Sequence, residues 1–185
     1  MMRGMDATFT LFDTAIGPCA LVWRGESLIG SALPAASPDA TRDAVRRRFR
    51  GAREGAPPPW PVSVIERMQA LLRGAKDDLA DIALDLGGVP AFNQRVYAVA
   101  RAIPPGRTLS YGEVAAKMGE ASHAARAVGE ALGANPLPII VPCHRVLAAG
   151  SQAGGFSAPG GTRTKLRLLE IEGAPLGGAP GLFDA

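Results

Sequence analysis

The period of the hydrophobic pattern changes once along this chain, near residue 91, and this change limits the folds that it can adopt. Residues 7–33 alternate apolar and polar positions in three short runs separated by glycine turns, which predicts an antiparallel β-meander. After residue 91, apolar residues recur at helical spacing, beginning with Phe92, Val96, Val99 and Ile103. We therefore predict an α+β fold with three parts: a small antiparallel sheet with helices over 1–90, a helical domain over 91–173, and a flexible tail over 174–185.

The first part also contains two predicted helices and a further strand. Ser37 precedes Pro38 as a helix N-cap precedes proline at the first helical position, and this helix should run to about Arg50 with its arginines in solvent. A second helix follows the proline-rich stretch 55–61 and ends near Gly74. Residues 81–86 alternate again, which predicts a fourth strand.

The second part contains a pattern typical of a helix-turn-helix. Ser110 and Glu113 have the spacing of a capping box, which predicts a helix to about Met118. After a short turn, Ser122 can cap a second helix that Gly133 closes. The second helix carries a face of small residues around one long cation, Arg126, and these small residues are Ala124, Ala125, Ala127 and Gly129. Such a face allows close approach to another surface, although many helical hairpins only pack.

The rest of the chain leads to a chemically distinctive segment. A stiff turn over 135–138 is followed by a predicted strand over 139–141, which runs into Cys143, His144 and Arg145. The glycine-rich residues 150–161 predict a loop folded over a site, and a last helix is expected from Thr162 to Glu172.

Charge and composition narrow the possible partners. The net charge is +3, but residues 1–90 are balanced, whereas residues 91–169 have nine Lys/Arg against three acidic residues. A basic half suits a nucleic acid, although a solvated surface is the commoner explanation. Two cysteines cannot form a disulfide framework, and with two histidines they barely supply the ligands of a tetrahedral zinc site, so the sequence gives little support for a metal site. Without a long apolar run or an N-terminal signal pattern, we expect a cytoplasmic protein that does not bind membranes.

Cys143 is the candidate nucleophile. A cysteine at a strand end is often only packing, but here an imidazole, a cation and a flexible loop lie within a few residues. A thiolate stabilised by a neighbouring base or positive charge is a good nucleophile. Glu172 ends the last helix and could orient the His144 ring in a Cys-His-Glu relay.

Several motifs in register then resemble one family. The run Pro142 to Val146, preceded by residues 124–129 and by Asn135-Pro136, is similar to the O6-alkylguanine-DNA alkyltransferases. Residues 110–115 and 165–172 fall in matching order, so the resemblance is strongest from Phe92 to Glu172. It implies a ribonuclease-H-like N-terminal domain and a single-use repair protein that needs no cofactor and no metal.

The resemblance implies a role for each catalytic residue. Cys143 would take the alkyl group from guanine O6, His144 would remove the thiol proton through a water molecule, and Glu172 would hold the imidazole. Tyr111 would donate to guanine N3, and Asn135 would brace the turn before the active-site strand. The Ser157 amide would serve O6, and the carbonyls of Cys143 and Val146 would accept from the exocyclic amine.

The implied partner is double-stranded DNA containing O6-alkylguanine, bound by a monomer through the minor groove without sequence preference. Arg126 would fill the place of the flipped nucleotide. The other expected substrate or DNA contacts are Ser110, Ala124, Ala125, Arg145 and Phe156.

This chain departs from the family pattern in the loop over the site. Phe156 stands where a tyrosine is common, Ala158-Pro159 lengthens the loop, and Gly133 replaces an arginine found in some relatives. Three alternatives remain: a lesion-binding protein without transfer, a helix-turn-helix regulator and a cysteine hydrolase. Retention of Cys143 argues against the first, and the Cys-His-Glu set is unexplained by the second.

Overall fold

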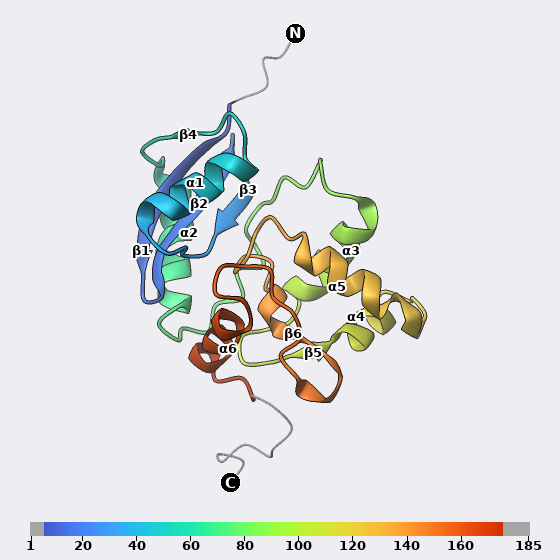
Figure 1. Cartoon of the computed structure of the whole chain (residues 1–185). Coiled ribbons are helices and arrows are strands. Elements are labelled where there is room, and N and C mark those ends of the chain that lie inside the picture. Colours follow the sequence, from blue (N-terminus) through green and yellow to red (C-terminus); the bar gives the residue numbers. More distant parts are fainter. Residues whose placement is uncertain (1–5, 176–185) are drawn as a thin grey trace.

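The computed structural model describes residues 6–175, which form a sheet unit and a helical unit (Figure 1). The predicted tail lies outside this range except for residues 174 and 175. The elements follow one another in the order β1 (Thr8–Thr14), β2 (Gly17–Arg24), β3 (Ser27–Ala32), α1 (Pro38–Arg48), β4 (Arg53–Glu54), α2 (Pro59–Leu71), α3 (Ala91–Arg101), β5 (Leu109–Ser110), α4 (Tyr111–Lys117), η1 (Ser122–Ala124), α5 (Ala125–Gly133), η2 (Cys143–Arg145), β6 (Val146–Leu147), η3 (Ala149–Ser151) and α6 (Gly161–Glu172).

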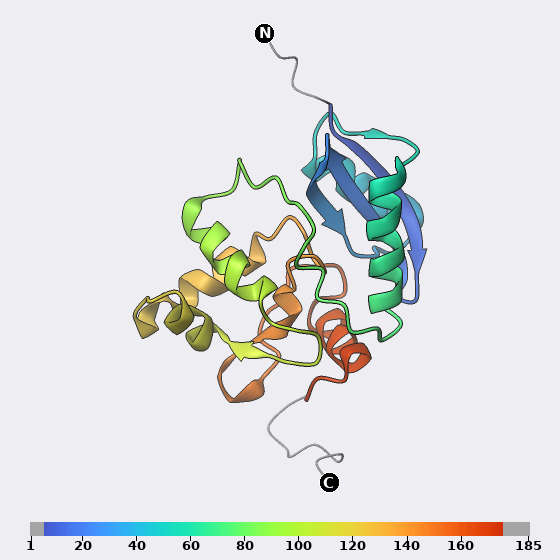
Figure 2. The same ribbon diagram turned by 180° about the vertical axis from the view of Figure 1, so that it is seen from behind.

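The N-terminal sheet has the strand order β3-β2-β1-β4, and a helix covers each of its faces. The predicted meander is confirmed, since β1 pairs antiparallel with β2 and β2 pairs antiparallel with β3. Alternate residues of β2 point to opposite faces, so Leu21 packs in the core cluster with Met68 of α2, and Val22 packs with Val45 of α1. The helix α1 lies in front of the sheet in Figure 1, and α2 lies in front of it in Figure 2. This burial on both faces explains why β2 is apolar along most of its length.

The α+β fold class is confirmed, but the predicted fourth strand is wrong. The fourth strand is the short β4, which pairs parallel with β1. Residues 81–86 meet the sheet at one isolated bridge, between Leu84 and Leu28 of the edge strand β3. The guanidinium of Arg101 donates to the carbonyl oxygens of Leu79, Ala80 and Ile82. This segment is therefore held by that side chain and by two backbone hydrogen bonds to Leu28, and it does not form a strand ladder.

The first helix of the predicted pair forms as expected, and the start of the second differs. Ser110 caps α4, because its hydroxyl accepts from the amide of Glu113, whose carboxylate accepts from the amide of Ser110. The second helix begins at Ala125 after the 3₁₀ turn η1. Within residues 6–175 the Ser122 side chain makes no capping hydrogen bond, so its predicted role as an N-cap is wrong.

The buried residues before the Cys143 segment form a tight turn instead of the predicted strand. Ile139 has a φ of 75°, and the amide of Val141 donates to the carbonyl of Leu137. Pro136 and Pro138 lack amide hydrogens, which removes two of the donors that a strand ladder would need. The turn is buried from Leu137 to Val141 except at Pro138, so the apolar run reflects burial and not pairing.

One core cluster joins the two units and places the Cys143 segment between them. It contains Leu33 and Met68 from the sheet unit together with Val96, Val128 and Cys143 from the helical unit. Over residues 6–175, no helix has the length and apolar character to cross a membrane.

Candidate active site

Cys143 lies at the bottom of a small cavity between the two units. The thiol residue is 9% exposed and begins the 3₁₀ turn η2, directly after the buried Pro142. The cavity has a volume of about 120 Å³, and its walls come from β3, α1 and the glycine-rich loop; among its lining residues are Ser31, Val45, Arg48, Phe49, Asn135, Phe156 and Ala158. A site made from both units was not predicted, because α1 has no sequence signal that links it to Cys143.

The predicted pairing of His144 with Glu172 is present. Nε2 of His144 lies 2.8 Å from Oε1 of Glu172, and both side chains are almost fully buried. Arg145 binds the same carboxylate, with Nη2 at 2.8 Å from Oε1 and Nε at 3.0 Å from Oε2. Burial alone would raise the pKa of Glu172, but the hydrogen bonds and charges of these two partners lower it to about 2. The carboxylate is therefore ionised at neutral pH.

Arg145, expected as a substrate or DNA contact, is instead a buried partner of Glu172. Its side chain is fully buried, and its Nη1 donates to the carbonyl of Ile103 at 2.7 Å. A guanidinium that is held on both sides by protein groups cannot reach a duplex on the surface. Arg145 instead supplies the positive charge that Glu172 needs inside the protein.

The geometry fixes the tautomer of His144. An ionised carboxylate can only accept, so Nε2 carries the hydrogen and donates to Glu172. Burial lowers the pKa of His144, and the opposing effect of Glu172 does not restore it. Nδ1 is buried and has no hydrogen-bond partner among the described residues. This nitrogen therefore presents a lone pair that can accept a proton.

Asn135 braces the segment before Cys143, as predicted for its position. Its amide nitrogen donates to the carbonyl of Val141 at 2.9 Å, and its oxygen accepts from the amide of Leu137 at 2.9 Å. Burial raises the pKa of the Cys143 thiol, whereas a hydrogen bond from Asn135 and the charge of Lys165 lower it. The turn and the thiol are therefore controlled by the same amide side chain.

Lys165 was missed as a candidate site residue. It is 1% exposed, and its ammonium donates to the carbonyl of Val146 at 2.6 Å, the carbonyl expected to face a guanine amine. The ammonium also lies 5.8 Å from the ring centre of Tyr111 and 6.0 Å from that of Phe156. Burial lowers its pKa to about 8. Its sequence signal was its spacing, because Lys165 shares a helix face with two buried leucines and Glu172.

The glycine-rich loop closes over Tyr111 and the cavity. A Cβ on Gly154, whose φ is +67°, would come within 3.0 Å of the Tyr111 hydroxyl, so glycine makes room for it. Phe156 is half-buried against the core, and the hydroxyl of the exposed Ser157 donates to the carbonyl of Gly133 at 2.9 Å. Burial raises the pKa of Tyr111, which keeps its hydroxyl protonated.

Four of the residues predicted to contact DNA lie at the start of α4 and in η1 and α5, namely Ser110, Ala124, Ala125 and Arg126. The side chain of Arg126 is 90% exposed and pairs loosely with Glu130 at 3.2 Å. Ala124 is buried and Ala125 half-buried beside it, whereas Ser110 is occupied in the cap of α4. Arg126 is therefore an exposed cation, and the small residues Ala124 and Ala125 pack beside it.

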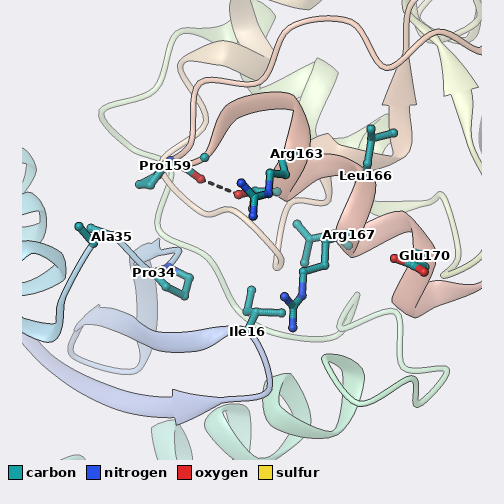
Figure 3. Close-up of a pocket in the computed structure, with 12 residues that line it drawn as sticks. Ile16, Pro34, Ala35, Pro159, Arg163, Leu166, Arg167 and Glu170 are labelled. Atoms are coloured by element: carbon teal, nitrogen blue, oxygen red, sulfur yellow. Dashed lines mark hydrogen bonds between the residues drawn. The ribbon is translucent and has the colours of Figure 1, made fainter.

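A larger pocket than the one at Cys143 lies elsewhere. It has a volume of about 1020 Å³ and runs between α6 and the sheet unit, where Arg163 and Arg167 face Ile16 and Pro34 (Figure 3). Its lining contains no candidate nucleophile or base from the predicted set. Size alone would therefore direct attention away from the buried polar groups around Cys143.

Comparison with known proteins places the chain in a family. Residues 91–174 match the family model described as 6-O-methylguanine DNA methyltransferase, DNA binding domain. The chain is 41% identical over 111 residues to a DNA base-flipping protein of Thermus thermophilus, covering 60% of this chain and 72% of that relative. The solved structure of Mycobacterium tuberculosis OGT in complex with DNA superposes with a TM-score of 0.73 at 35% identity, covering 91% of this chain and 95% of that one. A methylated-DNA–protein-cysteine methyltransferase of Mycobacterium bovis is 36% identical over 177 residues, which are 95% of this chain and 98% of the relative. With that agreement over nearly the full length of both chains, this protein belongs to the methylated-DNA–protein-cysteine methyltransferase family.

Proposed function

We propose that this protein repairs O6-alkylguanine in DNA by moving the alkyl group irreversibly to the sulfur of Cys143. The observation that carries the proposal is the buried set behind the thiol, in which Glu172 fixes the ring of His144 through a 2.8 Å contact. In the reaction the S–C bond forms and the C–O6 bond breaks. The thiol proton ends on the released guanine, so the atoms balance without a cofactor.

His144 is the base in this proposal. Its Nδ1 accepts the proton of Cys143 through a water molecule, and Glu172 stabilises the imidazolium that forms. The positive charge of Lys165 and the hydrogen bond from Asn135 favour the thiolate. The thioether that forms is stable, so each molecule reacts once.

The leaving guanine is neutralised by donors around the cavity. Tyr111 remains protonated because burial raises its pKa, so its hydroxyl can donate to guanine N3. The amide of Ser157 serves O6, while the carbonyls of Cys143 and Val146 accept from the exocyclic amine. Since Val146 already accepts from Lys165, its carbonyl uses a second lone pair for the base.

DNA binds along α4 and α5 through its minor groove in this proposal. Ala124 and Ala125 allow close contact with the backbone, and the exposed Arg126 enters the stack when the damaged nucleotide is turned out. The cavity is about 120 Å³ and is bounded by residues 156–159, so entry of the base requires this loop to shift. Contact with backbone rather than base edges suits a repair protein, because damage occurs at any sequence.

The test is the intact mass of the protein after mixing with an oligonucleotide that contains one O6-methylguanine. We expect a single added methyl group on Cys143, saturating at one per protein and absent in Cys143→Ala. Release of free product with turnover would indicate a hydrolase and overturn the proposal.

A second candidate is lesion binding without transfer. The similarity to the DNA base-flipping protein of Thermus thermophilus favours it, whereas the thiol of Cys143 and its buried base oppose it. Tight binding of the damaged oligonucleotide with unchanged protein mass would establish this second function instead.

A further inference from the structure

The backbone at the end of α6 is held by a lysine from the sheet unit. Glu172 is the last residue of this helix, so its carbonyl has no partner in the next helical turn. The ammonium of Lys76 donates to this carbonyl. A cation at this position also complements the negative end of the helix dipole.

The groups around this contact restrict the position of the Glu172 carbonyl. Gly106 packs so closely that a Cβ would lie 3.0 Å from the Glu172 oxygen. On the opposite chain segment, a Cβ on Gly74 would lie 3.5 Å from the carbonyl of Ile171. The segment that follows α2 passes beside α6 in both views (Figures 1 and 2).

Lys76 itself is fixed through its neighbour. Asp77 binds Arg67 of α2 through two contacts of 2.6 and 2.8 Å, and it also accepts from the amide of Leu79. The backbone that carries Lys76 is therefore tied to α2. Lys76 is itself exposed. It can still hold the end of α6, because the contacts of Asp77 fix the backbone beside it.

We infer that Lys76 is a positioning residue for the alkyl transfer. It holds the backbone of Glu172 so that the carboxylate stays within hydrogen-bond distance of His144 and Arg145. Lys76 touches neither substrate nor thiol, and it acts through the helix end. The inference rests on the proposed function, because it assigns a role within the same relay.

The charged groups around the Cys-His-Glu relay determine how the loss of rate should depend on pH. His144 and Arg145 face the carboxylate of Glu172 from η2, and Lys165 faces the same region from α6. If Glu172 drifts, His144 becomes a weaker base, so deprotonation of Cys143 suffers most near neutral pH. At higher pH hydroxide can also remove the thiol proton, so the reaction depends less on His144 and the loss should shrink. Titration of Lys165 affects both proteins and cancels in the ratio of their rates.

The experiment measures the rate of alkylation by free O6-benzylguanine between pH 6 and 9, followed by intact mass. We expect Lys76→Met to react about tenfold more slowly at pH 7, with the deficit narrowing toward pH 9. Lys76→Arg keeps a donor and should recover most of the rate. The matched control is Arg73→Met, which removes an exposed cation from the same segment and should react like the unchanged protein.

Thermal unfolding is measured on the same samples to separate positioning from stability. A loss that is uniform across the pH range, or a Lys76→Met rate equal to that of the unchanged protein, would overturn the inference. If the unchanged protein gains no mass from either O6-benzylguanine or methylated DNA, the proposed function fails. This second failure is recognised before any variant is compared.

Discussion

The two cysteines of this protein are both buried, yet their surroundings differ completely. Cys19 lies in β2 under the helix α2, and its sulfur is 3.7 Å from the hydroxyl of Thr14. Burial raises its pKa to about 12. Burial also raises the pKa of Cys143, but Asn135 and Lys165 oppose this effect. Burial therefore favours the protonated form of both thiols, and the reactivity of Cys143 depends on the polar groups that are buried with it.

The same difference separates the two regions as a whole. The sheet around Cys19 is filled by apolar side chains. The region around Cys143 buries five polar or charged side chains, namely Asn135, His144, Arg145, Lys165 and Glu172. Such groups are costly to bury and do not add to an apolar core. Their concentration in one place indicates a site that is organised for chemistry.

The largest expected effect comes from replacing each of the two cysteines by alanine in turn. Cys143→Ala should abolish alkyl uptake from O6-methylguanine DNA, because the accepting sulfur is gone. Cys19→Ala should retain one alkyl group per protein, since this thiol remains protonated in the sheet core. Peptide mapping after the reaction checks both variants. Alkyl groups found on Cys19 of the unchanged protein would contradict this prediction.

A second large effect is expected from breaking the buried ion pair. Glu172→Gln leaves the charge of Arg145 inside the protein without its carboxylate, which should cost about 3–5 kcal/mol in the free energy of unfolding. Denaturant unfolding measures this difference. The control is Asp81→Asn, which removes an ion pair with Arg67 at the surface and should hardly move the midpoint. Equal shifts for the two variants would show that burial does not matter here.

Acid should remove the contribution of the same carboxylate. The pKa of Glu172 is lowered from 4.5 to about 2 in the folded protein, so its stabilisation is present above pH 4.5 and is lost as the pH falls toward 2. The shift corresponds to about 3 kcal/mol. Because the pKa of His144 is also lowered, protonation of this ring destabilises the fold in the same direction below its usual value of 6.5.

The measurement is the unfolding free energy of the unchanged protein and of Glu172→Gln between pH 7 and 2.5. The advantage of the unchanged protein should shrink as the pH falls below 4.5, since both proteins then approach a neutral side chain at this position. A constant difference over the whole range would mean that Glu172 does not titrate as its contacts require.

The sequence predicted the elements better than it predicted the site walls. The meander, the capping box at Ser110 and the pairing of His144 with Glu172 follow from local pattern and from the family resemblance, and the structure confirms them. The strand expected before Cys143 is a turn, because an apolar run records burial and does not distinguish pairing from packing.

Contacts between distant segments could not be read from local pattern. Arg145 was expected among the substrate or DNA contacts, but its partner Glu172 lies 27 residues away at the end of α6. Lys76 likewise meets the end of α6 from 96 residues away. Only the fold brings these groups together, so a charge in the sequence says little about whether it faces water, nucleic acid or a buried acid.

The smallest expected effect comes from the exposed Arg126 of α5. Arg126→Ala removes a side chain that is 90% exposed and pairs with Glu130, not with a residue of the Cys-His-Glu relay. Alkylation by free O6-benzylguanine should therefore be unchanged. Alkylation by duplex O6-methylguanine should fall about tenfold, or about 1.4 kcal/mol, because the flipped state loses the group that fills the stack. The control is Glu130→Gln, which frees Arg126 from its pairing and should preserve both rates. Equal loss on free base and duplex would mean that Arg126 supports the fold of α5 rather than the extrusion of the nucleotide. The separation between buried chemistry and exposed DNA contact would then be wrong for this helix.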